Sequence, residues 1–147
     1  MDRTRLEPIV LWLPGGVRNE LHATGDDTGG AFCLSVDFPP TGWSLPSHRH
    51  LREAETIHVL EGRFDIVIDG DRTELGPGET IRIPAGVLHS GGNIGRAPGK
   101  RVVIFSPAGP EKFFLEIGAS EPGQSFDMRA VLEAATRHGF VFEADGA

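Results

Sequence analysis

Apolar and polar residues alternate with a period of two along several segments in the first two thirds of the chain. The clearest case covers residues 32–38, where small or polar residues separate Phe32, Leu34, Val36 and Phe38. Successive side chains of a strand point to opposite faces, so this alternation predicts a half-buried strand. Two prolines follow directly and end it, because proline cannot donate a backbone hydrogen bond to a neighbouring strand.

Turn-forming residues separate the other apolar segments. Asp69-Gly70-Asp71 is a strong hairpin signal between two of them. A strand and a turn recur about every eight to twelve residues, which is typical of a sandwich or barrel. The further predicted strands cover residues 17–23, 56–60, 64–69, 72–75, 80–83 and 102–105, and a turn is predicted at 25–27.

The last third of the chain changes to helical signals. Pro110 can open a helix that ends at Gly118, because proline suits the first helical turn and glycine suits the position after the last. Asp127 is a good N-cap for a second helix, which Gly139 closes. Residues 140–142 can add a short terminal strand. The pattern therefore predicts an all-β body followed by two short C-terminal helices.

Composition narrows the class of protein further. The 20 glycines and 11 prolines make up about a fifth of the 147 residues, which rules out a bundle of long helices. Without an internal repeat or linker, one domain over residues 1–147 is expected. A net charge of −7 argues against nucleic-acid binding, which needs clustered Lys and Arg. Cys33 is alone, which excludes an internal disulfide, and it is expected to be unreactive.

Six histidines are unusual in an acidic chain, and three of them are regularly placed. His48 and His50 are two residues apart, so on a strand both imidazoles face the same side. Glu55 can return a carboxylate to that side after a turn, and the turn at 84–86 can deliver His89 from another strand. Three neutral imidazoles and one carboxylate are suitable ligands for a divalent first-row metal ion.

The residues around these side chains follow two spaced patterns. The first is Gly42, five residues, His48-Arg49-His50, four residues, Glu55, six residues, Gly62. The second is Gly78, five residues, Pro84-Ala85-Gly86, two residues, His89, three residues, Asn93. Together they resemble the two motifs of the cupin superfamily, over about residues 30–107. The resemblance implies a cupin-type double-stranded β-helix, or jelly-roll barrel, with residues from about 108 to 147 as a C-terminal helical extension.

The cupin resemblance also implies a metal centre. Its ligands would be His48, His50, Glu55 and His89, and they would hold one divalent ion per chain, such as Fe, Mn, Ni or Zn. Glu53 is the competing carboxylate, but only Glu55 has the motif's spacing to the following glycine.

The segment after Ser106 is similar to small bacterial cupins described as quercetin-dioxygenase-like. This similarity implies a metal-dependent, dioxygenase-type oxidoreductase acting on a small chelating substrate, flavonol-like or enediol-like, with Glu55 as a base for a substrate hydroxyl. The same ligands would serve two alternatives. One is a non-redox isomerase, lyase or cyclase, and the other is a small-molecule binding or sensing module without turnover.

Three further residues near the motifs have their own interpretations. His58 lies three residues after Glu55 on the same strand, so it should point to the opposite face and bind no metal. Arg82 is expected on a solvated strand face, although it could reach an anionic substrate. Gly91, two residues after His89, stands where cupins often carry a bulky side chain, and it would enlarge the cavity if it faces the metal.

The apolar run at residues 9–13 is too short to cross a membrane, and the cytoplasm is the expected location. This run has little barrel of its own to bury it. In cupins such N-terminal strands often join the partner subunit's sheet, so a homodimer through this strand is expected. The other expected partner is a small-molecule substrate, and neither nucleic acid nor a membrane is expected.

Overall fold

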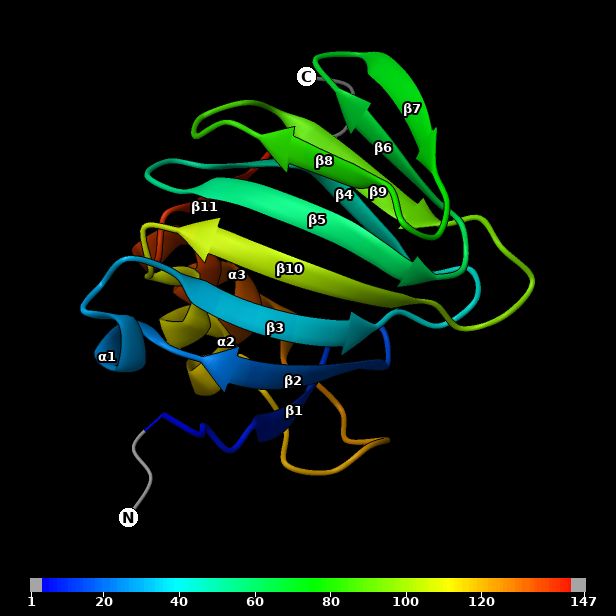
Figure 1. Ribbon diagram of the computed structural model, residues 1–147. Coiled ribbons are helices and arrows are strands. Elements are labelled where there is room, and N and C mark those ends of the chain that lie inside the picture. Colours follow the sequence, from blue (N-terminus) through cyan, green and yellow to red (C-terminus); the bar gives the residue numbers. More distant parts are fainter. Residues whose placement is uncertain (1–3, 144–147) are drawn as a thin grey trace.

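The computed structural model describes residues 4–143 and contains two antiparallel sheets that enclose a common core (Figure 1). The first sheet has six strands in the order β1-β2-β3-β10-β5-β8, and the second has five in the order β11-β4-β9-β6-β7. Neighbours such as β3 and β10 are far apart in sequence, as in a jelly roll. The strands are β1 (Ile9–Leu13), β2 (Val17–Ala23), β3 (Cys33–Phe38), β4 (Ser44–His50), β5 (Ala54–Glu61), β6 (Phe64–Ile68), β7 (Asp71–Leu75), β8 (Thr80–Ile83), β9 (His89–Asn93), β10 (Lys100–Ser106) and β11 (Phe140–Phe142).

The predicted strands and turns are present with small shifts at their ends. The hairpin between β6 and β7 has Asp69 and Gly70 at positive φ, 48° and 87°, as a tight two-residue turn requires. The predicted turn near residue 25 takes the form of a short helix, α1 (Gly25–Thr28). It begins where the backbone N–H of Thr24 donates to Asp27 Oδ2 at 2.9 Å, which stabilises the first helical turn.

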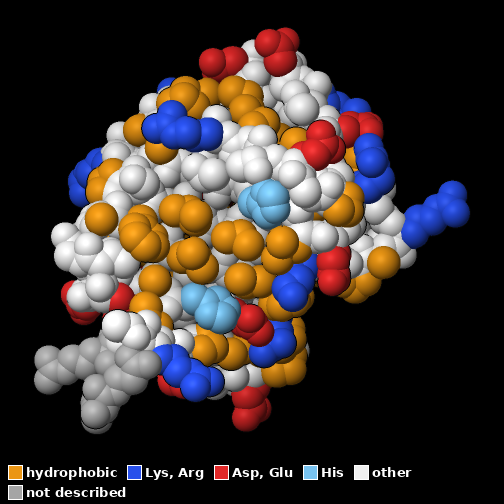
Figure 2. All heavy atoms as spheres, viewed as in Figure 1, with side chains coloured by type: hydrophobic (Ala, Val, Ile, Leu, Met, Phe, Trp, Pro, Cys, Tyr) orange, Lys and Arg blue, Asp and Glu red, His pale blue; other side chains and the backbone are white. Residues whose placement is uncertain are grey.

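The alternating strand β3 buries the side that carries its polar residues. Cys33, Ser35 and Asp37 are 0%, 1% and 6% exposed, whereas the apolar residues between them are only half-buried. The usual interpretation of such a pattern, with the apolar side inward, does not hold here. Figure 2 shows the consequence, because hydrophobic side chains gather on the outer face of the six-stranded sheet. Burial raises the pKa of Cys33 to about 12, which agrees with an unreactive thiol.

The helices α2 (Pro110–Ile117) and α3 (Met128–Arg137) lie behind β3 and β10 in the view of Figure 1. Asp127 caps α3 as predicted, because its carboxylate accepts hydrogen bonds from two backbone N–H groups of the first turn. The helices and β11 share a second apolar cluster that includes Phe113, Ala135 and Phe140. This cluster fixes the helices against the same strand, β11, that pairs with β4.

The N-terminal apolar run forms β1, which pairs with β2 of its own chain. Leu11 is buried, and Trp12 and Ala119 exchange backbone hydrogen bonds of 2.8 and 2.9 Å on the other side of β1. The run therefore has more contacts within the chain than the sequence suggested, although Ile9 and Val10 remain 43% and 37% exposed. Among the described residues, no helix is both long and apolar enough to cross a membrane.

Candidate metal centre and its cavity

The fold brings the four predicted ligands together from three strands. His48 and His50 lie on one face of β4, and His89 begins β9 directly opposite His48 in the register of the two strands. Glu55 comes from β5 in the other sheet. The turn before His89 is held against β4 by a 2.7 Å hydrogen bond from the N–H of Gly86 to the carbonyl of His50. This turn positions His89, as expected from its sequence.

The four side chains form a compact buried cluster. One ligand atom from each of His48, His50, Glu55 and His89 can be chosen so that all four atoms lie within 4.8 Å of one another. All four residues are less than 9% exposed. Glu55 Oε1 lies 3.2 Å from His50 Nε2 and 3.1 Å from His89 Nε2. Glu53, the alternative carboxylate, is also buried but lies outside the cluster.

Backbone carbonyls orient two of the imidazoles. His48 Nδ1 lies 2.8 Å from the carbonyl of Pro46, and His89 Nδ1 lies 2.9 Å from the carbonyl of Val87. A carbonyl only accepts, so each Nδ1 carries a proton. The Nε2 of His89 also faces the Glu55 carboxylate at 3.1 Å, and an ion bound there would replace the proton of that contact and leave Nε2 with its lone pair, as in His48. This is the tautomer that a metal-binding imidazole requires when it binds through Nε2.

His50 provides the test of whether the cluster suits a metal ion. Neither ring nitrogen of His50 has a hydrogen-bond partner within residues 4–143, because its approach to Glu55 is close in distance but poor in angle. The ring packs edge-on against Phe105 and Phe140, with centroids 4.9 and 4.5 Å away. An unpartnered buried nitrogen is costly, and an ion between Nε2 and the carboxylate would satisfy it. The residues therefore fit a divalent metal ion.

The protonation states support the same assignment. Burial and the neighbouring His89 together lower the pKa of His48 to about 4, so His48 is neutral at pH 7. Burial alone would raise the pKa of Glu55, but the adjacent imidazoles of His50 and His89 outweigh it and hold the pKa well below its usual value. For His89, burial would lower the pKa, yet the bond to Glu55 raises it. An ionised carboxylate thus faces the imidazoles.

A cavity of about 230 Å³ adjoins the cluster and is lined by His48, His50 and Glu55 among others. Most of its wall is apolar, with aromatic rings from β10, β11 and α2. Met128 and Leu132 of α3 belong to this wall and are 51% and 49% exposed, so they mark its opening to solvent.

Polar residues form another part of the wall, and the sequence did not identify them. Arg101 of β10 and Asp37 of β3 form a buried ion pair, with Arg101 Nε and Nη2 donating to the two carboxylate oxygens at 2.9 and 2.7 Å. Asn19 of β2 and Ser35 of β3 line the cavity beside them. One sequence feature could have identified them, the polar residues at alternate positions in β3. Such a pattern normally indicates a solvent-exposed face, but here these residues face the cavity.

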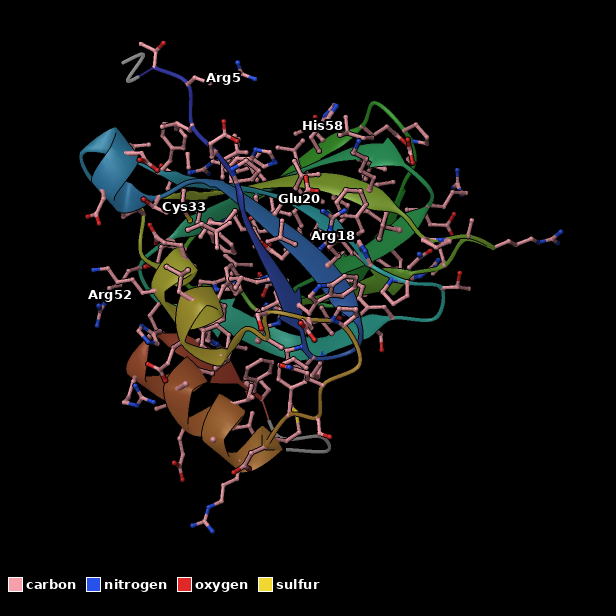
Figure 3. All side chains as sticks on the ribbon, turned by 90° about the horizontal axis from the view of Figure 1, so that it is seen from below. Arg5, Arg18, Glu20, Cys33, Arg52 and His58 are labelled. Atoms are coloured by element: carbon pink, nitrogen blue, oxygen red, sulfur yellow. The ribbon has the colours of Figure 1, made fainter. Side chains whose placement is uncertain are left out.

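Three neighbouring residues do not contribute to the cavity. Gly91 is not part of the cavity wall. A side chain at this position would point toward β6, where it would meet the carbonyl of Asp65 and the Ile66 side chain. Its missing side chain makes room for β6 and does not enlarge the cavity. Arg82 is exposed on β8 and points away from the cavity, as expected. His58 lies on the outer side of the six-stranded sheet, away from the helices (Figure 3), where its Nδ1 lies 2.7 Å from Thr80 Oγ1.

Comparison with known proteins agrees with this arrangement. The cupin domain family matches residues 34–105, which include both motifs. An uncharacterized protein of Methanocaldococcus jannaschii is 36% identical over 94 residues, which cover 64% of this chain and 74% of the relative. The chain belongs to the cupin superfamily.

Further proteins that this cupin resembles are an enzyme of known activity and a solved structure. Quercetin 2,3-dioxygenase of Bacillus subtilis is 29% identical over 114 residues, which cover 78% of this chain and 34% of the enzyme. This cupin thus spans about a third of that relative's length. An RmlC-like cupin from Shewanella frigidimarina has a similar structure, with a TM-score of 0.62, 20% identity, and coverage of 76% of this chain and 93% of the other. At that identity the likeness concerns the fold alone.

Proposed function

We propose that this cupin binds one divalent transition-metal ion through His48, His50, Glu55 and His89 and adds both atoms of dioxygen to a small chelating organic substrate. The observation that carries the proposal is the buried, convergent cluster at the wall of an apolar cavity. The similarity to the Bacillus dioxygenase supports oxygen chemistry and a flavonol-like or enediol-like substrate.

The bound metal would act as a Lewis acid for the chelating oxygens and would bring substrate and dioxygen together. The three imidazoles hold the ion, and the carbonyls of Pro46 and Val87 keep the rings of His48 and His89 in position. Glu55 is ionised, so its carboxylate can accept the proton of a substrate hydroxyl. The aromatic wall excludes water from the reacting end of the substrate.

Oxygen consumption with a flavonol tests the proposal. The protein is loaded with Fe(II) under anaerobic conditions and mixed with 3-hydroxyflavone in air-saturated buffer, and oxygen uptake and flavonol absorbance are followed together. One molecule of oxygen should be consumed for each flavonol, and His50→Ala should abolish both signals. His58→Ala is the matched control, because His58 lies on the outer face and should retain full activity.

The same assay separates the alternatives. Substrate loss at an equal rate without oxygen would identify a non-redox enzyme. Tight flavonol binding without turnover, with Fe(II), Mn(II) or Ni(II), would identify a binding module. Either result contradicts the proposed dioxygenase activity.

A further inference from the structure

The polar wall of the cavity contains two buried groups that lack partners. Asn19 is 4% exposed and Ser35 is 1% exposed, and both line the cavity. Asn19 Oδ1 and Ser35 Oγ have no hydrogen-bond partner within the described part of the chain. Burying such a group without a partner is unfavourable, so a ligand that supplies the missing bonds is favoured.

The strand register places this polar wall at a definite distance from the metal cluster. Phe105 of β10 lies opposite Glu55 of β5, and the next inward residue of β10, Val103, lies opposite Ser35 of β3. Two residues along a strand cover about 7 Å, so Ser35 lies one such step from the level of Glu55. Arg101 lies one step further, about 13 Å from that level along β10.

Asn19 lies at the same level as Arg101, two steps along the strands from the level of Glu55. It lies opposite Asp37 in the register of β2 and β3, and Asp37 lies opposite Arg101. On adjacent strands Asn19 and Ser35 are therefore diagonal neighbours on one face, within reach of a single ligand group. Along β10 the wall is apolar at the level of Ser35, where Val103 lies, and at the level of Glu55, where Phe105 lies.

The charges of this wall decide which group it accepts. The Arg101 guanidinium is engaged by Asp37 through two hydrogen bonds, so the pair is close to neutral and offers little attraction to an anion. A carboxylate at this position would also face the Asp37 carboxylate and an Asn19 oxygen that only accepts. A hydroxyl group suits both partners, because it can donate to Asn19 Oδ1 and accept from the Ser35 hydroxyl.

Building on the function proposed above, we propose that Asn19 and Ser35 form a hydroxyl-binding subsite that selects uncharged substrates. Such a substrate has a chelating end at the metal, an apolar body, and a hydroxyl group about 7–13 Å away, at the level of Ser35 and Asn19. The cavity of about 230 Å³ lies below the range of about 300–1,000 Å³ that is usual for drug-sized ligands, so the substrate is compact. Substrates with an anionic tail are disfavoured.

Binding of small probes to the metal-free protein tests the subsite without reference to metal or oxygen. The probes are 4-propylphenol, 4-propylanisole and 4-propylbenzoate, which share an apolar body and differ in the terminal group. Calorimetric titration in EDTA should show the phenol binding about three- to tenfold more tightly than the anisole, the effect of one or two hydrogen bonds. The benzoate should bind more weakly than either.

Variants test whether Asn19 and Ser35 cause the preference for the phenol over the anisole. Ser35→Ala should reduce the preference for the phenol over the anisole to about twofold or less while leaving anisole binding unchanged, and Asn19→Leu should do the same. Ser125→Ala is the matched control, because Ser125 is exposed in the loop before α3 and should keep the full preference. Ser35→Ala removes one buried oxygen without adding bulk, so it is expected to fold.

Equal affinities of phenol and anisole in the unaltered protein would overturn the subsite, since they would mean that water already satisfies these groups. Tighter binding of the benzoate would overturn the proposed neutrality of the wall. Failure of the dioxygenase proposal gives a different result: the phenol preference persists in the metal-free protein, while 3-hydroxyflavone is not oxidised by the Fe(II) form.

Discussion

The buried ion pair between Arg101 and Asp37 should make a large and asymmetric contribution to stability. The two side chains are 7% and 9% exposed, and the Arg101 guanidinium lies 5.0 Å from the Trp43 ring centroid and 5.1 Å from that of Phe64. Asp37→Val removes both acceptors and leaves a cation in a low-dielectric wall. Two charge-assisted hydrogen bonds of about 1.5–3 kcal/mol each are lost, consistent with the cost of about 3–5 kcal/mol for breaking a buried pair.

Removing both charges should cost much less. In Asp37→Val/Arg101→Met no buried charge is left without a partner, so the free energy of unfolding should recover to within about 1–2 kcal/mol of the unaltered protein. For a chain of this length, about 3–5 kcal/mol corresponds to a fall in the melting temperature of roughly 10 °C for the single variant.

Urea unfolding followed by tryptophan fluorescence measures these differences, because Trp43 contacts the pair. EDTA is present throughout so that metal binding does not contribute to stability. Glu74→Val, which removes the surface ion pairs of Glu74 with Arg63 and Arg72, should leave the midpoint nearly unchanged. A double variant as unstable as Asp37→Val would refute the reasoning, because the cost would then come from lost packing and not from an uncompensated charge.

Three further predictions concern the metal centre, the helices and the assembly. His50→Ala should lower metal affinity at least tenfold, which mass spectrometry detects as a loss of metal per chain. His58→Ala should retain about one ion per chain, and an equal loss of metal in both variants would exclude the proposed ligands. Hydrogen bonds from Arg137 and His138 lower the pKa of Glu116 to about 2, so the ionised carboxylate stabilises the contact of α2 with α3. The stability that Glu116→Gln loses at pH 7 should therefore disappear as the pH falls from about 4.5 to 2, and a pH-independent difference would contradict this. We also propose a homodimer that involves the exposed residues Ile9 and Val10 of β1. Val10→Lys should therefore convert it to a monomer in light scattering, and an unchanged mass would argue against this interface.

The sequence predicted the features that depend on local spacing. His48 and His50 share a face because of their separation alone, and the turn around Gly86 positions His89 as its glycine suggested. The four candidate ligands could therefore be named before the structure was known.

Features that depend on the opposite wall could not be predicted in this way. Ser35 and Asp37 follow a pattern that normally indicates solvent, and only the partner strands β2 and β10 show that these residues face a cavity. Arg101 satisfies Asp37 from a position 64 residues away, a pairing that no local pattern records. The idea that Gly91 enlarges the cavity was wrong for the same reason. The Ile66 side chain, which lies where a side chain of residue 91 would be, comes from another strand.

The pairing of β11 with β4 determines when the metal centre can be completed during synthesis. His48 and His50 lie opposite Phe142 and Phe140, so their strand is an edge strand until those residues are made. Chains emerge from the ribosome with the N-terminus first, and domains generally fold as units. The chain must therefore be synthesised through Phe142 before these two histidines gain their final neighbours. The nascent protein should accordingly acquire metal only after residues 140–142 have emerged, although every proposed ligand lies between residues 48 and 89.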